Sequence, residues 1–355
     1  MIAFDPSAGL DPSREYAIRG AAPVDKPRYG ENYMLSAYDP KLDLGMWLHW
    51  GTCPDSFSLW EEMVMITLPG DNGLLWTRAY HKPRPEDRPN GPNLHYRVVE
   101  PFRQLQISFE GVAMRTPYQE MLTGRVRDTS QELLDLELDV RAAGPAWDNH
   151  LSAESGTGRG SMKEQTWASE HFQQPIRVRG TVRVDGRELA FDGSGTRDHS
   201  RGQRGHGEWS FGGHNLMVAP FDSGKSFGMQ RMWTPKGKPT LEVAFVCIDG
   251  EMRHCDIVTR PAFLEAVRLS DDPIELVLRS SLGDHVIRGR TAKTIYSTVG
   301  RPWSFHLGAD LSEPRGLFVP GFAVYEWDGE TAAGLCERSG PVGVAFDLGR
   351  AWSVE

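Results

Sequence analysis

The sequence predicts an all-β protein with two antiparallel domains, and three observations carry this prediction. Apolar and polar residues alternate along many short segments, Asp-Gly turn signals separate these segments, and no window has the period of a long amphipathic helix. Many short strands with glycine-rich turns are typical of a sandwich or a barrel. A chain of 355 residues is long for one domain and comfortable for two.

The composition narrows the class of protein further. A net charge of −9 argues against nucleic acid as the main partner. No apolar run approaches the length of a membrane span, and the N-terminus lacks the pattern of a secretory signal. The four cysteines are far apart without C-x-x-C spacing, so neither a zinc site nor a disulfide framework is indicated. We expect a cytoplasmic protein with reduced thiols. Its oligomeric state stays open.

The elements can be justified in chain order. Residues 1–45 have no clear period, and we expect them to form an arm laid along the surface of a domain, of which residues 1–29 precede the first domain. Period-two alternation then predicts strands at 105–109, 133–140 and 176–184. Hairpin turns are predicted where Asp-Gly or a Pro-to-Gly run separates strand-like segments, at Asp185-Gly186, Asp192-Gly193, Asp249-Gly250, Asp328-Gly329 and 69–73. Residues 82–97 predict a long loop, and 143–175 a long, mobile insertion.

Composition shifts divide the chain into an N-terminal β domain at 30–195, a joining motif at 196–204 and a C-terminal β domain at 205–350. Around the joint, residues 191–215 combine three histidines, three acids and three arginines with seven glycines. So many glycines argue against a helix and favour a tightly turning backbone with titratable groups aimed inward. A cleft between two β domains is a common ligand site.

Asp198 and His199 are the candidate acid–base residues of this segment. On a regular strand their side chains point to opposite faces, so they share one site only if the backbone is irregular there. His199 would then act as general acid or base with Asp198 as its partner, or the roles would be reversed. Arg201 and Arg204 could keep the carboxylate ionised or hold a substrate oxygen. A buried Arg–Asp–His network that pins the two domains together is the alternative interpretation, and the spacing alone slightly favours it over catalysis.

Further candidates would form a pocket wall or a metal site. Strand-like runs hold many aromatics, each of which suits a core; incompletely filled barrels would instead give an apolar cavity. The residues expected on such a wall are Trp50, His81, Trp209, His214, Tyr325 and Glu326. His206, Glu208 and His214 form a minority alternative as metal ligands, without an H-E-x-x-H motif. Dinucleotide, P-loop and G-x-S-x-G motifs are absent, so the sequence predicts chemistry without a cofactor.

Residues 193–204, GSGTRDHSRGQR, resemble a known family motif, G-x-G-x-RDHSWGxR. The motif belongs to the two-domain lipocalin-like proteins related to carotenoid 1,2-hydratases, kievitone hydratases and lipocalin-like pericyclases. Residues 169–189 and 322–339 resemble flanking parts of the same proteins. The resemblance implies two packed β-barrels or half-barrels and an apolar ligand in or between them. It also implies water addition or removal, or cofactor-free rearrangement.

Asp198, His199, Ser200, Gly202 and Arg204 match the motif, whereas Arg201 replaces its tryptophan and Gln203 its small residue or proline. A cation at 201 favours a substrate that carries a carboxylate, phenol or ketone. We therefore expect a cofactor-independent lyase or isomerase, of hydratase or dehydratase type, acting on a hydrophobic, oxygenated terpenoid, steroid or aromatic molecule. Asp198, His199 and Arg204 would be catalytic. A non-catalytic lipocalin-like carrier is the alternative.

Overall fold

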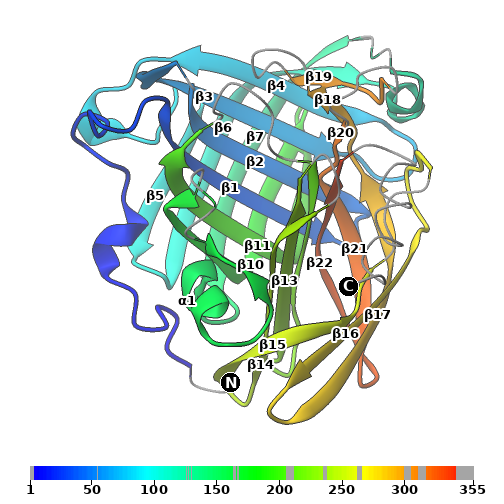
Figure 1. Ribbon diagram of the computed structural model, residues 1–355. Coiled ribbons are helices and arrows are strands. Elements are labelled where there is room, and N and C mark those ends of the chain that lie inside the picture. Colours follow the sequence, from blue (N-terminus) through cyan, green and yellow to red (C-terminus); the bar gives the residue numbers. More distant parts are fainter. Residues whose placement is uncertain are drawn as a thin grey trace.

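The computed structural model describes residues 4–53, 55–124, 126, 128, 130–162, 165, 168–204, 212–234, 238–261, 266–299, 305–310 and 317–340. This part of the chain forms two closed, antiparallel eight-stranded β-barrels packed against each other (Figure 1). The predicted all-β class and the two-barrel arrangement are confirmed. Within the same residues, no helix is long and apolar enough to span a membrane.

The first barrel follows an arm that carries the 3-10 helix η1 (Pro12–Glu15). Around the barrel, the strand order is β11 (Arg187–Gln203), β1 (Tyr29–Asp39), β2 (Leu44–Cys53), β3 (Ser56–Thr67), β4 (Leu74–His81), β6 (Gln104–Thr116), β7 (Ser130–Ala142) and β10 (Glu170–Val184). Pairing of β10 with β11 closes the ring. Strand β5 (Leu94–Glu100) pairs with β6, and the turns include η2 (Pro85–Asp87) and η3 (Tyr118–Thr123).

The second barrel begins after the chain leaves β11. Its order is β13 (Ser226–Trp233), β12 (Gly213–Pro220), β22 (Glu330–Ser339), β21 (Gly321–Trp327), β17 (Gly283–Thr294), β16 (Pro273–Ser280), β15 (Glu251–Thr259) and β14 (Pro239–Ile248), closed by β13 with β14. A small sheet joins β19 (Phe305–Leu307), β18 (Ser297–Val299) and β20 (Leu317–Phe318).

The segment between β7 and β10 connects both barrels. Strand β8 (Trp147–Asp148) pairs with β10 of the first barrel, whereas β9 (Arg159–Gly160) pairs with β14 of the second. The helix α1 (Asn149–Glu154) lies between them in sequence. The described part of the predicted 143–175 insertion therefore contributes a strand to each sheet.

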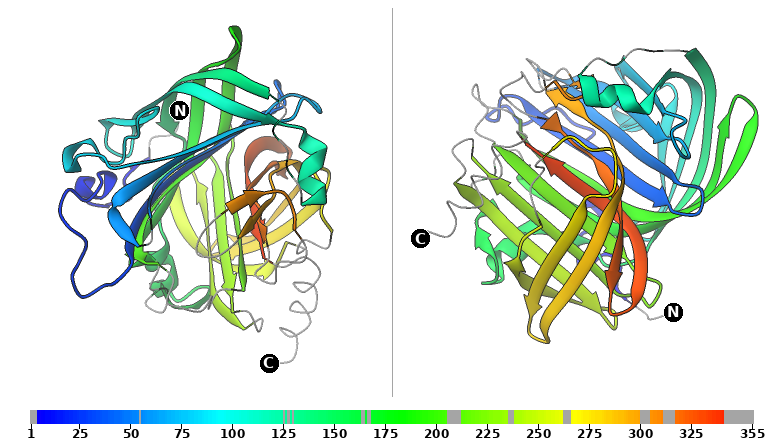
Figure 2. Two further views of the ribbon diagram at one scale, coloured as in Figure 1. Left: turned by 90° about the horizontal axis from the view of Figure 1, so that it is seen from above. Right: turned by 90° about the vertical axis from the view of Figure 1, so that its right-hand side faces the viewer.

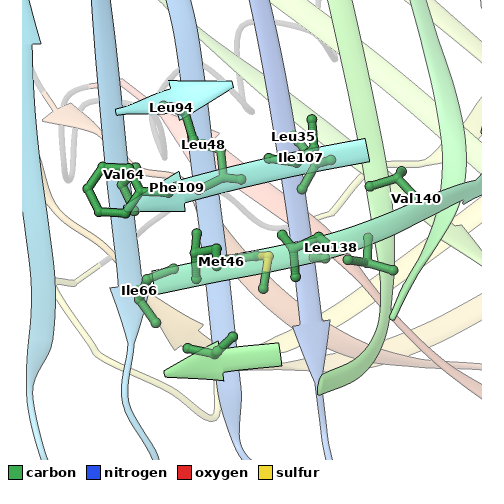
Figure 3. Packing of buried hydrophobic residues seen from close by; sticks show 14 of the residues in the cluster. Leu35, Met46, Leu48, Val64, Ile66, Leu94, Ile107, Phe109, Leu138 and Val140 are labelled. Atoms are coloured by element: carbon green, nitrogen blue, oxygen red, sulfur yellow. The ribbon is translucent and has the colours of Figure 1, made fainter. Parts of the chain in front are cut away.

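Alternation along the strands builds three main cores. Side chains such as Leu35, Leu48, Val64 and Ile107 fill the interior of the first barrel (Figure 3). A second apolar cluster fills the interior of the other barrel. The third joins Met34, Trp47 and neighbours on the outer face of the first barrel to residues of the second, and so forms the seam between the barrels (Figure 2).

Most predicted turns are confirmed. Asp185-Gly186, Asp249-Gly250 and Asp328-Gly329 each have two positive φ angles and connect paired strands, as in a type I′ hairpin. Residues 69–73 connect β3 to β4. The four cysteines are free, and Cys247 lies opposite Met252 in its hairpin.

Three predictions about elements are wrong. Asp192-Gly193 lies inside β11 and is no turn, because both flanking segments continue one strand. Residues 82–97 include η2 and the start of β5, because Leu94 and Tyr96 are buried and pair with β6. The N-terminal arm ends before residue 45, because Tyr29–Asp39 form β1, and it does more than follow a surface, since its Glu15 is completely buried.

Candidate active site between the barrels

Strand β11 is regular through Asp198 and His199, so these two side chains point to opposite sides of the barrel wall. In the pairing register, Tyr33 of β1 lies opposite His199 and Met34 opposite Asp198. Tyr33 belongs to the interior core, whereas Met34 belongs to the seam. The expectation of an irregular backbone is wrong: glycines such as Gly195 allow close strand approach instead, because a Cβ there would lie 1.9 Å from the Ser36 carbonyl oxygen.

His199 lies inside the first barrel in a closed hydrogen-bond network. Its Nδ1 is 2.8 Å from the Arg14 carbonyl oxygen and its Nε2 is 2.9 Å from Glu31 Oε1. Since a carbonyl oxygen only accepts, Nδ1 carries a hydrogen, and another proton must lie between Nε2 and Glu31. Burial lowers the pKa of His199. Its ring stacks on Tyr33 with centroids 3.9 Å apart.

Arg201 belongs to the same network rather than to the seam. Its Nε donates to Glu31 Oε1 at 2.8 Å, and its Nη1 donates to Glu170 at 3.2 Å. A pocket of about 440 Å³ lies beside it, lined by Ser13, Tyr16, Ala17, Ile18, Arg19 and Arg201. The structure therefore places the residue that replaces the motif tryptophan under the N-terminal arm.

The arm itself inserts a carboxylate into this network. Arg197 donates to both oxygens of Glu15, with Nη2 2.8 Å from Oε2, and its Nε donates to Gln174 Oε1 at 2.9 Å. Glu15 also accepts from the Phe102 amide at 2.7 Å. Glu15 and the Arg197 side chain are 0% and 5% exposed. This buried ion pair anchors the arm to β11.

Asp198 lies on the outer face of the first barrel with a different set of partners. Its Oδ2 contacts Nε2 of His171, a residue of β10. Ser200 follows on the same face, and Arg204 donates to both its carbonyl oxygen and its hydroxyl at 2.9 and 3.0 Å. Burial lowers the pKa of Arg204 to about 10, whereas the charge of Asp198 acts to raise it. A carboxylate, an imidazole and a guanidinium thus meet on this face.

A second histidine–carboxylate pair lies on the second barrel. His214 of β12 contacts Glu337 Oε1 of β22 through its Nε2. Ser339 donates to the same carboxyl oxygen at 3.2 Å. Burial raises the pKa of Glu337 to about 8 and lowers the pKa of His214 to about 4. At neutral pH the pair is therefore uncharged, with one proton shared between the acid and the imidazole.

The two pairs face each other across the seam. Strand β11 packs against both β12 and β22, and the charge of Asp198 acts to raise the pKa of Glu337 as well as that of His214. The side chains of Asp198 and His214 are 13% and 17% exposed, more than the 2% and 5% of their partners His171 and Glu337. We call His171, Asp198, His214 and Glu337 the seam cluster.

Apolar and aromatic side chains continue the seam beside this cluster. Trp47 stacks on His49 at 5.4 Å and meets Phe318 edge-on at 5.5 Å between ring centroids. Phe318 also lies 6.5 Å from the His214 ring. Met34 and Met63 pack in the same core and are 8% and 7% exposed. The seam therefore joins polarizable methionine and aromatic side chains to the two histidine–carboxyl pairs.

Four other sequence candidates lie apart from the seam cluster. Trp50 is buried inside the first barrel, where its Nε1 donates to the Leu94 carbonyl oxygen at 3.2 Å. Tyr325 is buried inside the second barrel and donates to the Leu335 carbonyl oxygen at 2.7 Å. His81 contacts the Asn90 carbonyl oxygen at 3.0 Å. Glu326 is exposed and accepts from Gly329.

The remaining candidates fall in residues 205–211. Trp209 and the metal alternative's His206 and Glu208 lie outside the described residues. Among the residues that the structure describes, no group of three or more His, Cys, Asp or Glu side chains is arranged to hold a metal ion.

Sequence reasoning missed His171 and Glu337. For His171 a signal existed, because the Asp185-Gly186 turn fixes the register of β10 and β11 with Val184 opposite Arg187. Counting outward from that pair places Gln173 opposite Asp198 and His171 opposite Ser200. Glu337 had no such signal, because β22 meets β12 across more than 100 residues of chain.

Comparison with known proteins places the chain in a family. The model of a family described as "Domain of unknown function (DUF7064)" matches residues 17–342. The chain belongs to this family. No curated protein sequence matches it.

Solved structures share the fold at low sequence identity. An AttH-like protein from Nitrosomonas europaea has a TM-score of 0.53 at 14% identity, with 90% of this chain and 95% of that chain covered. Kievitone hydratase from Nectria haematococca gives 0.52 at 11% identity, covering 92% and 95%. CghA with Sch210972 gives 0.51 at 9% identity, covering 89% of both. The lipocalin-like two-barrel fold implied by the sequence motif is confirmed.

Proposed function

We propose that the protein is a cofactor-independent lyase or isomerase that acts by acid–base catalysis on a hydrophobic, oxygenated small molecule bound in the seam between the barrels. One observation carries the proposal: two histidine–carboxyl pairs lie on the two walls of the seam, and burial raises the pKa of Glu337 in one of them to about 8. A carboxyl group whose pKa is raised by burial is a usual candidate for a general acid.

Asp198 is the base in this proposal. Its carboxylate accepts a proton from substrate carbon or oxygen, and His171 on its Oδ2 holds the side chain in position. Arg204 is a positioning residue. It is anchored to Ser200 on the same face and adds positive charge near Asp198. The proposal retains Asp198 and Arg204, which the sequence-based assignment also named, and replaces His199 by His171.

Glu337 with His214 is the acid. A protonated carboxyl with a pKa of about 8 can donate to a leaving hydroxyl or to an alkene carbon near neutral pH. Ser339 orients the same carboxyl group by donating a 3.2 Å hydrogen bond to its Oε1. Proton removal on one wall and proton delivery on the other is what adding or removing water, or shifting a double bond, requires.

The test begins with a panel of terpenoids, steroids and oxygenated aromatics incubated with the protein in D2O. Mass spectrometry then reports deuterium uptake or a change by the mass of water. We expect turnover by the wild type and at least a 100-fold loss in Asp198→Asn, about the lower end of what general-base catalysis contributes.

Asp192→Asn is the matched control, because Asp192 lies on the same strand with its side chain 50% exposed. It should retain wild-type turnover. Equal turnover by Asp198→Asn and Asp192→Asn would refute the assignment. Ligand retained unchanged by every variant would identify a carrier instead.

A further inference from the structure

Gln173 is the most unusual side chain of the seam. It is 0% exposed, yet among the described residues neither its Nε2 nor its Oε1 has a hydrogen-bond partner. A buried amide without partners costs free energy, and most buried polar groups in proteins avoid it. Such a group is unexplained by folding alone.

The register places Gln173 beside the proposed base. Gln173 of β10 lies directly opposite Asp198 of β11, and His171 follows on the same face. Directly opposite side chains on antiparallel strands have Cβ atoms roughly 5 Å apart. On its other side Gln173 pairs with Trp147 of β8. The amide thus belongs to the wall that carries Asp198.

Two more buried polar atoms without partners in the described chain continue this wall. They are Ser36 Oγ and Trp47 Nε1, which lie opposite one another on β1 and β2 in the next row of the sheet. Both side chains face the seam along with Met34. The seam wall therefore offers unused donors and acceptors in addition to its acid and base.

We propose that Gln173 binds the carbonyl group of the substrate, and that the substrate class is a hydrophobic β-hydroxy ketone or the α,β-unsaturated ketone formed from it. This rests on the proposed function. An amide presents a donor and an acceptor side by side, which matches a carbonyl oxygen next to a hydroxyl group. The neighbouring base then faces the carbon between these two groups, whose hydrogen the carbonyl acidifies.

The reaction balances with the groups in the seam. Asp198 takes the proton from the carbon next to the carbonyl, and that C–H electron pair forms the carbon–carbon double bond. The bond from the β-carbon to oxygen breaks with its electrons on oxygen, and the proton of Glu337 completes a water molecule. Proton exchange with released water restores both residues. Hydration is the reverse.

The test compares two pairs of substrates, one with the carbonyl group and one without it. One is chalcone with its β-hydroxy dihydro form, and the other is the matching alkene and alcohol in which a methylene group replaces the carbonyl. Wild type and Gln173→Met are assayed on both pairs. Gln174 is unsuitable as a control position because its side chain accepts a hydrogen bond from Arg197. Gln106→Met, an exposed glutamine of β6, is the matched control.

We expect the wild type to convert the ketone pair in an Asp198-dependent reaction. Gln173→Met should raise KM for the ketone about 3- to 10-fold, as the loss of one hydrogen bond predicts. Its melting temperature should equal or exceed that of the wild type, because a buried amide without partners is removed. Gln106→Met should change neither value.

Two results would overturn the inference and leave the proposed function standing. One is Asp198-dependent turnover of the carbonyl-free pair at a rate equal to that of the ketone. The other is Gln173→Met with unchanged KM or with a melting temperature several degrees lower, which would assign Gln173 to folding. Absence of Asp198-dependent turnover on both pairs and on the wider panel would remove the proposed function itself.

Discussion

At the scale of single residues, burial decides what the ionisable side chains can do. Asp198 and His199 are neighbours in sequence, yet one faces the seam and the other the barrel interior. His199 is enclosed by Glu31, Arg14 and Tyr33 and is only 4% exposed. Glu337, in contrast, is held protonated beside a partly exposed histidine. The same residue types thus serve a structural network and a proposed catalytic one.

Glu337 should leave a signature in the pH dependence of stability. Burial raises its pKa from 4.5 to about 8, so the folded state holds a proton that the unfolded state has lost, and stability falls as the pH rises through that interval. His214 opposes this trend below 6.5, because its pKa is lowered to about 4. Between pH 6.5 and 8, Glu337 is the only member of the pair that makes the unfolding free energy depend on pH. We expect the unfolding free energy to fall there in the wild type.

Glu337→Gln should remove this slope in urea unfolding. Glu326→Gln, which changes an exposed glutamate, should retain it. A slope that persists unchanged in Glu337→Gln would mean that Glu337 is ionised in the folded protein.

At the scale of elements, the N-terminal arm completes the first barrel. Its η1 delivers Glu15 into the barrel end, where Arg197 and Phe102 bind it. The arm also supplies backbone carbonyl oxygens to His199 and Arg201. In Figure 1 the arm runs along the side of the first barrel and down toward α1. An element without regular strands therefore secures β11, the strand that carries Asp198.

Breaking this contact should destabilise the protein strongly. Glu15→Gln leaves Arg197 buried without a counter-charge, and the loss of one partner of a buried ion pair costs about 3–5 kcal/mol. Glu188→Gln breaks an exposed pair with Arg183 and should cost less than about 1 kcal/mol. Chemical denaturation measures both. Equal, small effects would show that the arm is not part of the folded core.

At the scale of the whole molecule, the sequence predicted local structure but not the contacts between distant segments. Alternation and Asp-Gly turns predicted strands such as β10, and the motif at 193–204 indicated two barrels. The register of the Asp185-Gly186 hairpin was sufficient to place His171 on the same face as Asp198. The Glu15 and Glu337 contacts depend on how distant segments pack, and no local spacing encodes them. Gly195 was misread because a glycine needed for close strand approach looks like one needed for a turn.

The central claim is that the chemistry lies between the barrels rather than inside one of them. A crystal structure of the protein with a compound that it converts, or with the product, tests this most directly. We predict that the ligand lies against the outer face of β10 and β11, with polar atoms within hydrogen-bonding distance of Asp198 and of Glu337 or His214. A ligand enclosed in the first barrel beside Trp50, or in the second beside Tyr325, would contradict the account.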